Sequence, residues 1–257
     1  MINKLLGTFD AKLVRKSSHE ILVSKESKFR LYELSEFIDH NYFGEYFKNL
    51  PNSKSQLGQD LFALSRLGFK RNGFFVEFGA TNGINLSNSY LLETKFNWNG
   101  ILAEPAKLWH SSLKKNRSVS IEIDCVWKST GETLLFNEIN NGQDGELSTI
   151  DCFSGNDYHQ NVRKTSGNKY EVKTISLSDM LKKYNAPKNI DYLSIDTEGS
   201  EFEILKAFNF DEYKIKVITC EHNFTSNRDK IHNLLSSNGY KRIFTELSFW
   251  DDWYEKK

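Results

Sequence analysis

Acidic residues lie in or directly after several apolar runs of this sequence. The run FFVEF contains Glu77 and leads into a turn with Gly79 and Gly83, and the run GILA is followed by Glu104 and Pro105. Glycines let a backbone turn tightly and approach a ligand closely. A carboxylate beside such a turn can bind a cation or accept hydrogen bonds from hydroxyl groups. The pattern therefore predicts a ligand site where buried strands end.

The turn after FFVEF does not match two common nucleotide motifs. Its glycines lack the G-x-G-x-x-G spacing of dinucleotide sites, and no Gly-Lys-Ser/Thr follows as in a P-loop. Glu77, two residues before Gly79, would repel a pyrophosphate. A cationic ligand such as an amino group or a sulfonium fits this acid better.

Two later run ends supply groups that suit a nucleoside. Glu104 lies 21 residues after Gly83, and an acid at about this spacing binds ribose hydroxyls in dinucleotide folds. The run SVSIEIDCVW contains Asp124, Cys125 and Val126, where an acid or a backbone amide could contact adenine. Taken singly, each feature is typical of an ordinary turn. Their order along the chain favours a ligand with an amino-acid part, a ribose and an adenine, which describes S-adenosylmethionine.

The candidates for catalysis follow two further apolar runs. DYLSID ends at Asp196, with Glu198 two residues on, and VITCEHN contains Glu221 and His222. We expect His222 to be a general base or to orient the acceptor, with Asp196 and Glu198 beside it. Asp196, Glu221 and His222 could instead bind Mg²⁺ or Mn²⁺, since oxygen ligands and imidazole suit these ions. The alternatives are a structural histidine and acids that belong to a solvated helix start.

Two other segments are expected to border the site. The polar stretch CFSGNDYHQNVRKTSGNKY, residues 152–170, is interpreted as a mobile loop over the site. Its His159 is a weaker candidate base that we expect at the surface. Most of the tryptophans are interpreted as core or interface residues, while WDDWY, residues 250–254, is expected to border the acceptor pocket.

The order of elements predicts how these residues are brought together. Buried strands are expected at FFVEF, GILAEP, SVSIEIDCVW, DYLSID and KIKVITCEHN, alternating with helical segments such as SNSYLLETKF and SEFEILKAF. ETLLFNEI and ELSTID are interpreted as antiparallel strands or hairpin pieces. Alternating strands and helices predict a doubly wound, mostly parallel α/β sheet with helices on both faces. Ligands bind such sheets beyond the carboxyl ends of the strands.

Composition bounds the class of protein. The chain has 257 residues, 39% of them apolar and 26% charged, which predicts a globular protein with one large domain. Lysine plus arginine and aspartate plus glutamate number 34 each, so nothing suggests nucleic acid or an anionic membrane as partner. The three cysteines suggest neither a metal pair nor a disulfide framework. No signal-type segment and no apolar stretch of about 18 residues is found, so a cytoplasmic protein without a membrane span is expected.

The residues from about Ser55 to the end of the chain resemble the FkbM-type methyltransferase family. The resemblance is carried by SQLGQDLFAL, GFFVEFGATNG, LSNSYLLETKFNWNGILAEP, IDYLSIDTEGSEFEIL and VITCEHN. This family is similar to class I S-adenosylmethionine-dependent methyltransferases, which have a Rossmann-like, seven-stranded sheet. Thr81 stands where class I loops usually have their second glycine, a departure common in the FkbM-like group. The resemblance implies a methyltransferase domain at 55–257. The small extension at 1–54 lies outside the resemblance, and the spaced apolar residues of FRLYELSEFIDHNYFGEYFKNL predict one or two short helices in it.

The resemblance also implies roles for individual residues. The residues implied to bind S-adenosylmethionine are Gln56, Gln59, Asp60, Glu77, Gly79, Ala80, Asn82, Gly83, Ser87, Asn88, Glu104, Pro105, Asp124, Cys125, Val126 and Asp196. His222, Asp196 and Glu198 are the expected catalytic residues, and Asp196, Glu221 and His222 the expected ligands of Mg²⁺ or Mn²⁺. For Gln56, Gln59 and Asp60, the alternative interpretation is an ordinary helix start.

The expected activity is methyl transfer from S-adenosylmethionine. We expect O-methylation of a hydroxyl, or of a phosphate-type oxygen, on a sugar, a glycan precursor or a secondary metabolite. The alternatives are a cofactor-binding module without catalysis and a nicotinamide oxidoreductase, which the missing dinucleotide fingerprint disfavours. The sequence does not identify the small-molecule or glycan acceptor, and it leaves oxygen or nitrogen methylation and a homo-oligomer open.

Overall fold

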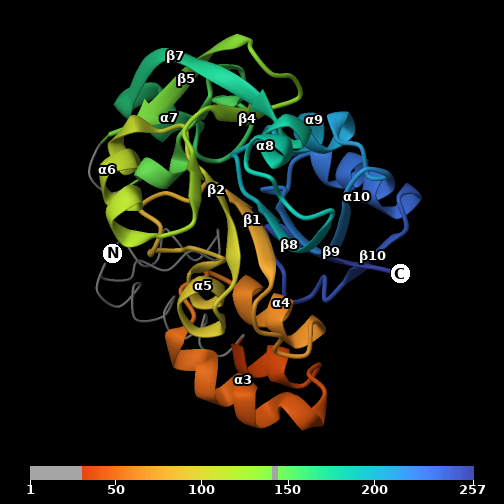
Figure 1. The fold of residues 1–257 in the computed structure, drawn as a ribbon. Helices are drawn as coiled ribbons and strands as arrows, with labels where there is room; N and C mark the ends of the chain where they lie inside the picture. Colours follow the sequence, from red (N-terminus) through yellow and green to blue (C-terminus); the bar gives the residue numbers. More distant parts are fainter. Residues whose placement is uncertain (1–30, 141–143) are drawn as a thin grey trace, which may run out of the picture.

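The computed structural model describes residues 31–140 and 144–257, which form a large central sheet flanked by helices (Figure 1). The sheet has seven strands in the order β10-β11-β9-β8-β1-β2-β3. Their bounds are β1 Phe74–Phe78, β2 Asn99–Ala103, β3 Ser120–Glu122, β8 Asn189–Ile195, β9 Lys214–Glu221, β10 Tyr240–Ile243 and β11 Asp251–Lys256. Only β11 runs antiparallel to its neighbours β9 and β10. The predicted mostly parallel, seven-stranded sheet is confirmed.

The central strands are buried on both faces because their side chains alternate between two apolar cores. On β1, Val76 and Phe78 join one core, while Phe75 joins the other. Such strands appear in a sequence as nearly continuous apolar runs. Two groups of helices cover the two faces: α4 Gln59–Arg66, α5 Tyr90–Phe96 and α6 Lys107–Asn116 on one, and α8 Leu177–Lys183, α9 Glu201–Ala207 and α10 Asn227–Ser237 on the other. The predicted doubly wound arrangement is thus confirmed.

The described part of the expected N-terminal extension packs on the core that contains Phe75. It includes α3 Phe43–Asn49 and the short 3₁₀ helices His40–Tyr42 and Leu50–Asn52. Leu34 and Tyr46 are buried there beside α4. Residues 1–30 of that extension lie outside the described residues.

A second, smaller sheet lies against the carboxyl edge of the central one, at the top of Figure 1. Its order is β4-β7-β5-β6, with β4 Cys125–Trp127, β5 Thr133–Ile139, β6 Thr149–Ile150 and β7 Gly167–Ser176. The prediction of one strand across SVSIEIDCVW was wrong, since it is divided between β3 and β4. The Glu122 carboxylate accepts hydrogen bonds from the backbone N–H groups of Ile123 and Asp124, which turns the chain from one sheet into the other.

The prediction of a long loop at 152–170 was also wrong in part. This stretch contains a 3₁₀ turn at Asp151–Phe153, the helix α7 Gln160–Ser166 and the first residues of β7. β7 pairs with β5 from Gly167 opposite Ile139 to Lys173 opposite Thr133. This ladder satisfies backbone groups that a loop would leave to water, although most side chains on this part of β7 are exposed and polar.

The ends of β1 and β8 lie in close contact. Gly79 has a φ of +73°, and a Cβ at this position would lie 2.1 Å from the carbonyl oxygen of Asp196. Only glycine fits both this conformation and this distance. The turn after β1 is therefore held directly against the residue that follows β8. Among the described helices, none is long and apolar enough to cross a membrane.

Candidate active site

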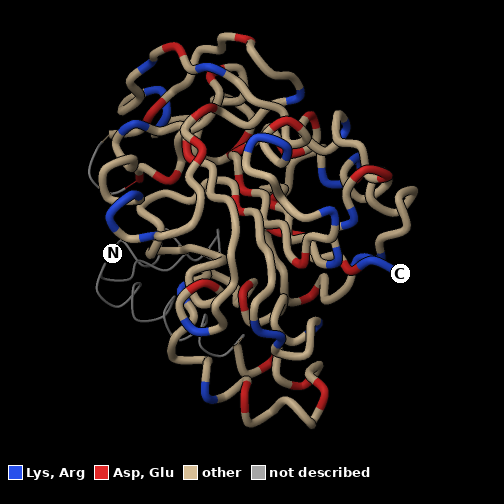
Figure 2. The backbone as a smooth tube through the Cα atoms, viewed as in Figure 1, with Lys and Arg blue, Asp and Glu red and all other residues tan. Residues whose placement is uncertain are grey.

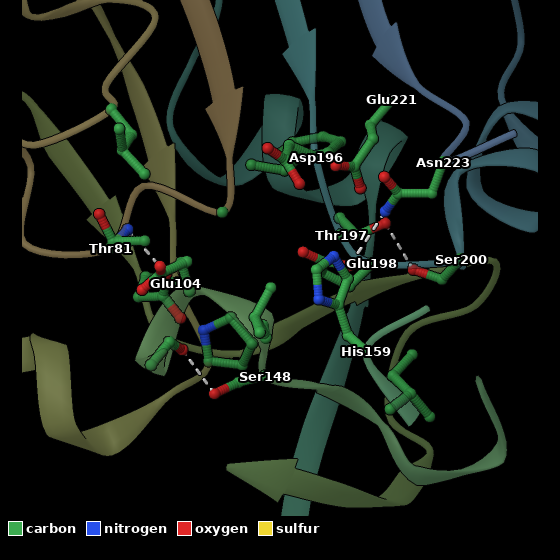
Figure 3. Close-up of a pocket in the computed structure, with 18 of the residues that line it drawn as sticks. Thr81, Glu104, Ser148, His159, Asp196, Thr197, Glu198, Ser200, Glu221 and Asn223 are labelled. Atoms are coloured by element: carbon green, nitrogen blue, oxygen red, sulfur yellow. Dashed lines mark hydrogen bonds between the residues drawn. The ribbon is translucent and has the colours of Figure 1, made fainter. Parts of the chain in front are cut away.

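A cavity of about 530 Å³ opens between the carboxyl ends of β1, β2, β8 and β9 and the second sheet. Thr81 and Glu104 lie on one side of it, and His159, Asp196, Glu198, Glu221 and Asn223 lie on the other (Figure 3). This is the edge at which open α/β sheets bind ligands. Figure 2 shows acidic positions gathered in the middle of the molecule, where these strands end.

The cavity brings together many of the residues predicted from the sequence. Those that line it are Gln56, Glu77, Gly79, Asn88, Glu104, Pro105, Cys125, Val126, Asp196, Glu198 and Glu221. The remaining predicted residues do not line it; they are Gln59, Asp60, Ala80, Asn82, Gly83, Ser87, Asp124 and His222. Several members of this second group support the wall from behind.

Glu104, after β2, is fixed by two backbone groups. Its Oε1 accepts a hydrogen bond from the N–H of Ala106, and its Oε2 accepts one from the N–H of Thr81, both at 2.8 Å. Burial raises the pKa of the Glu104 carboxyl to about 7. Each oxygen keeps a further lone pair for another donor. The carboxylate is thus held in one orientation with accepting capacity left for a ligand.

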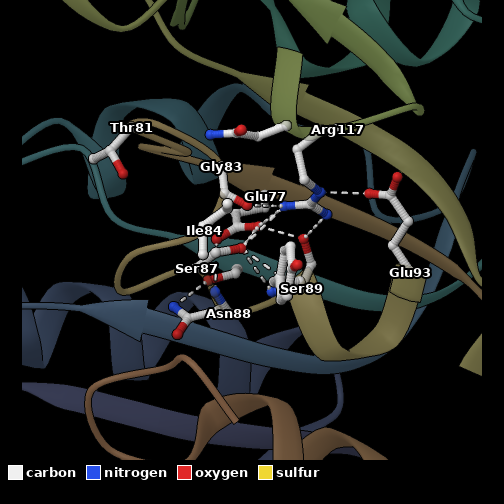
Figure 4. Close-up of polar contacts among 12 residues, drawn as sticks. Glu77, Thr81, Gly83, Ile84, Ser87, Asn88, Ser89, Glu93 and Arg117 are labelled. Atoms are coloured by element: carbon white, nitrogen blue, oxygen red, sulfur yellow. Dashed lines mark hydrogen bonds and ion pairs between the residues drawn. The ribbon is translucent and has the colours of Figure 1, made fainter. Parts of the chain in front are cut away.

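Glu77 is used mainly to hold the glycine-containing loop (Figure 4). Its Oε1 accepts from the backbone N–H of Asn88 at 2.7 Å, and its Oε2 accepts from the hydroxyls of Ser87 at 3.0 Å and of Ser89. Burial raises the pKa of the Glu77 carboxyl, and the nearby Arg117 guanidinium opposes this rise. Glu77 therefore fixes the path of the loop, although part of it also reaches the cavity wall.

Arg117 links this loop to the helices and was not identified from the sequence. The side chain is buried, and its Nη1 lies 3.9 Å from Glu77 Oε2. The same guanidinium donates to the carbonyl oxygen of Gly83 at 3.0 Å and to Ser89 Oγ at 2.9 Å, and it pairs with Glu93. Arg117 follows a helix forty positions after Glu77, and no local pattern connects the two.

The N-terminal candidates hold the wall rather than face the cavity. Gln59 donates from Nε2 to Asp251 Oδ2 at 2.8 Å and accepts from the N–H of Leu57 at 2.9 Å. Asp60 accepts from the hydroxyls of Ser53 and Ser55, both at 2.7 Å. These contacts fix the segment that places Gln56 on the cavity wall.

Three carboxylates meet at the other side of the cavity. One carboxylate oxygen each from Asp196, Glu198 and Glu221 lie within 4.8 Å of one another. Burial raises the pKa of Asp196 to about 7, and burial together with the charges of neighbouring acids raises the pKa values of Glu198 and Glu221 well above normal. Glu221 Oε2 is buried without a hydrogen-bond partner among the described residues. The group is short of positive charge and would be stabilised by a cation.

His222 lies outside this group of carboxylates. It is 3% exposed, and its Nδ1 accepts a hydrogen bond from the N–H of Phe224 at 3.0 Å. Its Nε2 lies 3.8 Å from Asp252 Oδ1. Burial lowers the pKa of His222 to about 4, so the ring is neutral near pH 7. The structure thus groups Asp196 and Glu221 with Glu198 rather than with the predicted His222.

The segment between β6 and β7 brings His159 to the cavity. The sequence suggested a surface position for His159, but the structure places it half-buried on the wall. The backbone N–H of His159 donates to Asp157 Oδ1 at 2.7 Å. The buried Arg163 pairs with both oxygens of Asp157 and donates at 2.7 Å to Glu198 Oε2. Arg163 therefore ties this segment to the end of β8, a connection that the sequence does not reveal.

The two tryptophans of WDDWY have different environments. Trp250 lines the cavity, as the sequence analysis expected of this segment. Trp253 is buried and stacks on Phe62 with 4.6 Å between ring centroids. Only the first of them is placed to contact a ligand.

Comparisons with known proteins identify one family. The family described as Methyltransferase FkbM domain matches residues 77–242, more than half of the chain. No sequence among curated proteins matches the chain.

Three solved structures share a similar arrangement at low sequence identity. Methyltransferase FkbM from Methylobacillus flagellatus KT aligns with a TM-score of 0.44 and 13% identity over 88% of this chain and 57% of that chain. Precorrin-6y C5,15-methyltransferase from Geobacter metallireducens GS-15 aligns with a TM-score of 0.37 and 13% identity over 72% of each chain. A chain of a fibrillarin/Nop5p complex aligns with a TM-score of 0.38 and 12% identity over 79% of this chain and 81% of that chain.

Arg117 is predicted to be needed for stability. Replacing it with methionine should lower the free energy of unfolding by about 3–5 kcal/mol, because Glu77 then stays buried without its counter-charge. The measurement is equilibrium urea unfolding. Arg66→Met is the matched control, since the Arg66–Glu255 pair is about one-third exposed, and it should cost at most about 1 kcal/mol. Equal losses in the two variants would contradict this role for Arg117.

Proposed function

Since the chain belongs to the methyltransferase FkbM domain family, we propose that it transfers a methyl group from S-adenosylmethionine to a hydroxyl oxygen. The observation that carries this proposal is the acidic lining of the cavity. Seven carboxylate residues line it, and the described lining residues include no lysine or arginine. A sulfonium is a cation without hydrogen-bond donors, so surrounding carboxylates are a suitable way to stabilise it.

The residues present fit the parts of this cofactor. Glu104 lines the cavity and keeps accepting capacity on both carboxylate oxygens for two ribose hydroxyls, and Cys125 and Val126 offer a lining for adenine. Asn88 Oδ1 is buried without a hydrogen-bond partner among the described residues and could accept from an amino group. When bound, the cofactor supplies a methyl group on a positively charged sulfur, which keeps the electron pair of the broken bond.

Residues of the chain would orient the acceptor and accept its proton. An attacking hydroxyl must lose its proton as the new C–O bond forms, and a nearby carboxylate can accept it. Asp196, with its pKa raised to about 7 by burial, is partly ionised near neutral pH. We propose Asp196 as this base, with Glu198 orienting the acceptor. The buried His222 is less suited to this role because its pKa is lowered to about 4 and it lies outside the carboxylate group.

The lining charges also favour one kind of acceptor. Phosphate-type oxygens are commonly bound by lysine or arginine, and the described cavity lining offers neither. A neutral hydroxyl on a sugar, a glycan precursor or a secondary metabolite is therefore the proposed acceptor.

A divalent cation bound by these carboxylates is the alternative to Asp196 as a free base. Asp196, Glu198 and Glu221 supply oxygen ligands of the type that Mg²⁺ and Mn²⁺ prefer. The unpartnered Glu221 Oε2 fits a cation ligand, while Glu198 Oε2 is already occupied by Arg163 and Asn223. Such an ion would lower the pKa of a hydroxyl bound beside it.

Glu104 is predicted to be needed for cofactor binding. Glu104→Ala should weaken binding of S-adenosylmethionine by about 10- to 100-fold, because two ribose hydroxyls lose a charged acceptor. Isothermal titration calorimetry measures this. Asp191→Ala is the matched control, since Asp191 is a buried acid near the start of β8 that does not line the cavity. Unchanged affinity in Glu104→Ala would contradict the proposed ribose site.

Mn²⁺ binding is predicted to depend on Glu221. Titration followed by electron paramagnetic resonance should show one bound Mn²⁺, with affinity reduced at least about tenfold in Glu221→Gln. His222→Asn should bind Mn²⁺ as the unmodified protein does, because His222 is outside the carboxylate group. Absence of bound Mn²⁺, or a loss in His222→Asn alone, would contradict this ligand set.

A further inference from the structure

Backbone strain is concentrated around the cavity. Of the eleven non-glycine residues with positive φ in the described chain, five line it: Thr81, Leu86, Glu198, Asn223 and Phe224. Asn223 and Phe224 are consecutive, with φ of 44° and 54°. A bulky residue in this conformation is unusual, and such strain gathers at functional sites. The turn formed by Asn223 and Phe224 is therefore a candidate functional element of the cavity wall.

His222 and Trp250 hold this strained turn. The N–H groups of His222 and Asn223 donate to the carbonyl oxygen of Trp250 at 2.8 and 3.2 Å. The N–H of Phe224 donates to His222 Nδ1 at 3.0 Å, and the N–H of Thr225 donates to the His222 carbonyl oxygen at 2.8 Å. Each backbone N–H of the turn thus has a partner, and the His222 ring supplies one of them.

The turn presents one polar and one apolar side chain at the cavity. Asn223 Nδ2 donates to Glu198 Oε2 at 3.1 Å. Phe224 lines the cavity while 58% exposed, and so does Tyr158, the neighbour of His159, at 83%. Aromatic side chains commonly line ligand-binding pockets. We call Tyr158 and Phe224 the aromatic mouth.

The sequence neighbours of the aromatic mouth lie at the end of the cavity away from the proposed nucleoside site. Asn223 and His159, the neighbours of the two aromatic residues, lie on the opposite side from Thr81 and Glu104 (Figure 3). The proposed ribose and adenine contacts are made on the Glu104 side. The aromatic mouth is thus placed to contact the acceptor rather than the cofactor.

We propose that the aromatic mouth binds the apolar face of a neutral, polyhydroxylated ring, such as a pyranose, and directs one of its hydroxyls toward Asp196. This proposal rests on the proposed function and extends it to acceptor recognition. Aromatic rings offer a flat apolar surface at low entropic cost. The carboxylates can accept hydrogen bonds from hydroxyls, and the Asn223 amide can both accept and donate them. The lack of lysine and arginine in the described lining disfavours an anionic ring. His222 is then a positioning residue, which acts by holding Phe224.

The test is saturation-transfer NMR with methyl glycosides of glucose, galactose, mannose and 6-deoxyhexoses at millimolar concentration. Signals are recorded with and without S-adenosylhomocysteine, whose own binding is measured by calorimetry. At least one glycoside should receive saturation from the unmodified protein. Phe224→Ala and Tyr158→Ala should each reduce that signal about fivefold or more, with unchanged affinity for S-adenosylhomocysteine.

Three further variants separate recognition from a general loss of structure. Leu135→Ala is the matched control, since Leu135 is 44% exposed on β5 and does not line the cavity; it should leave the glycoside signal unchanged. His222→Phe removes the acceptor of the Phe224 N–H and should reduce the signal as Phe224→Ala does. His222→Asn supplies a carbonyl oxygen near the position of Nδ1 and should restore it.

The outcomes distinguish this proposal from the proposed function. If S-adenosylhomocysteine binds but no glycoside receives saturation, or if Phe224→Ala and Tyr158→Ala keep the full signal, the aromatic mouth does not bind a sugar ring. If S-adenosylhomocysteine fails to bind while the glycoside signal depends on Phe224 and Tyr158, the sugar site stands and the methyltransferase proposal fails.

Discussion

The burial of several carboxylates around one cavity is the constraint on which the rest of the site depends. Ionised carboxylates in an apolar surrounding are costly, and burial raises the pKa values of Glu104 and Asp196 to about 7. A raised pKa in the folded state means that the folded protein loses stability as the pH rises through that value. A cation in the cavity would offset this cost, which is the electrostatic basis of the proposed sulfonium ligand.

Two buried arginines, which do not line the cavity, stabilise the segments that form its wall. Arg117 pairs with Glu77 and Glu93 and holds the glycine-containing loop after β1. Arg163 pairs with Asp157 and Glu198 and holds the segment before β7 against the end of β8. Each arginine neutralises an acid without adding positive charge to the cavity wall. The fold can thus fix the wall on both sides and still leave the cavity acidic.

The sequence predicted the central sheet and the acids at its strand ends, because apolar runs and motif spacing are local properties. It did not predict that adjacent side chains at a strand end point in different directions. Glu221 and His222 are adjacent in sequence, but Glu221 faces the carboxylate group, whereas His222 turns toward Asp252 and the Phe224 N–H. Consecutive residues of a strand point to opposite sides, and the strained turn after Glu221 begins at this position.

β7 and the two buried arginines could not be predicted from the sequence for similar physical reasons. β7 was missed because its polar side chains hide a strand that is defined by pairing with β5. The links from Arg117 to Glu77 and from Arg163 to Glu198 were missed because these partners lie 40 and 35 positions away in the sequence. Long-range pairing and the contacts of buried charges are set by the tertiary structure, which no local pattern contains.

The central claim, that the acidic cavity binds the sulfonium of S-adenosylmethionine, is tested most directly by comparing it with S-adenosylhomocysteine, whose sulfur is neutral. Calorimetric titrations of both compounds between pH 6 and 8.5 isolate the contribution of the positive charge. As Glu104 and Asp196 ionise around pH 7, the affinity for S-adenosylmethionine relative to S-adenosylhomocysteine should rise by about tenfold. A ratio that stays constant or falls with pH, or absence of binding by both compounds, would contradict the account.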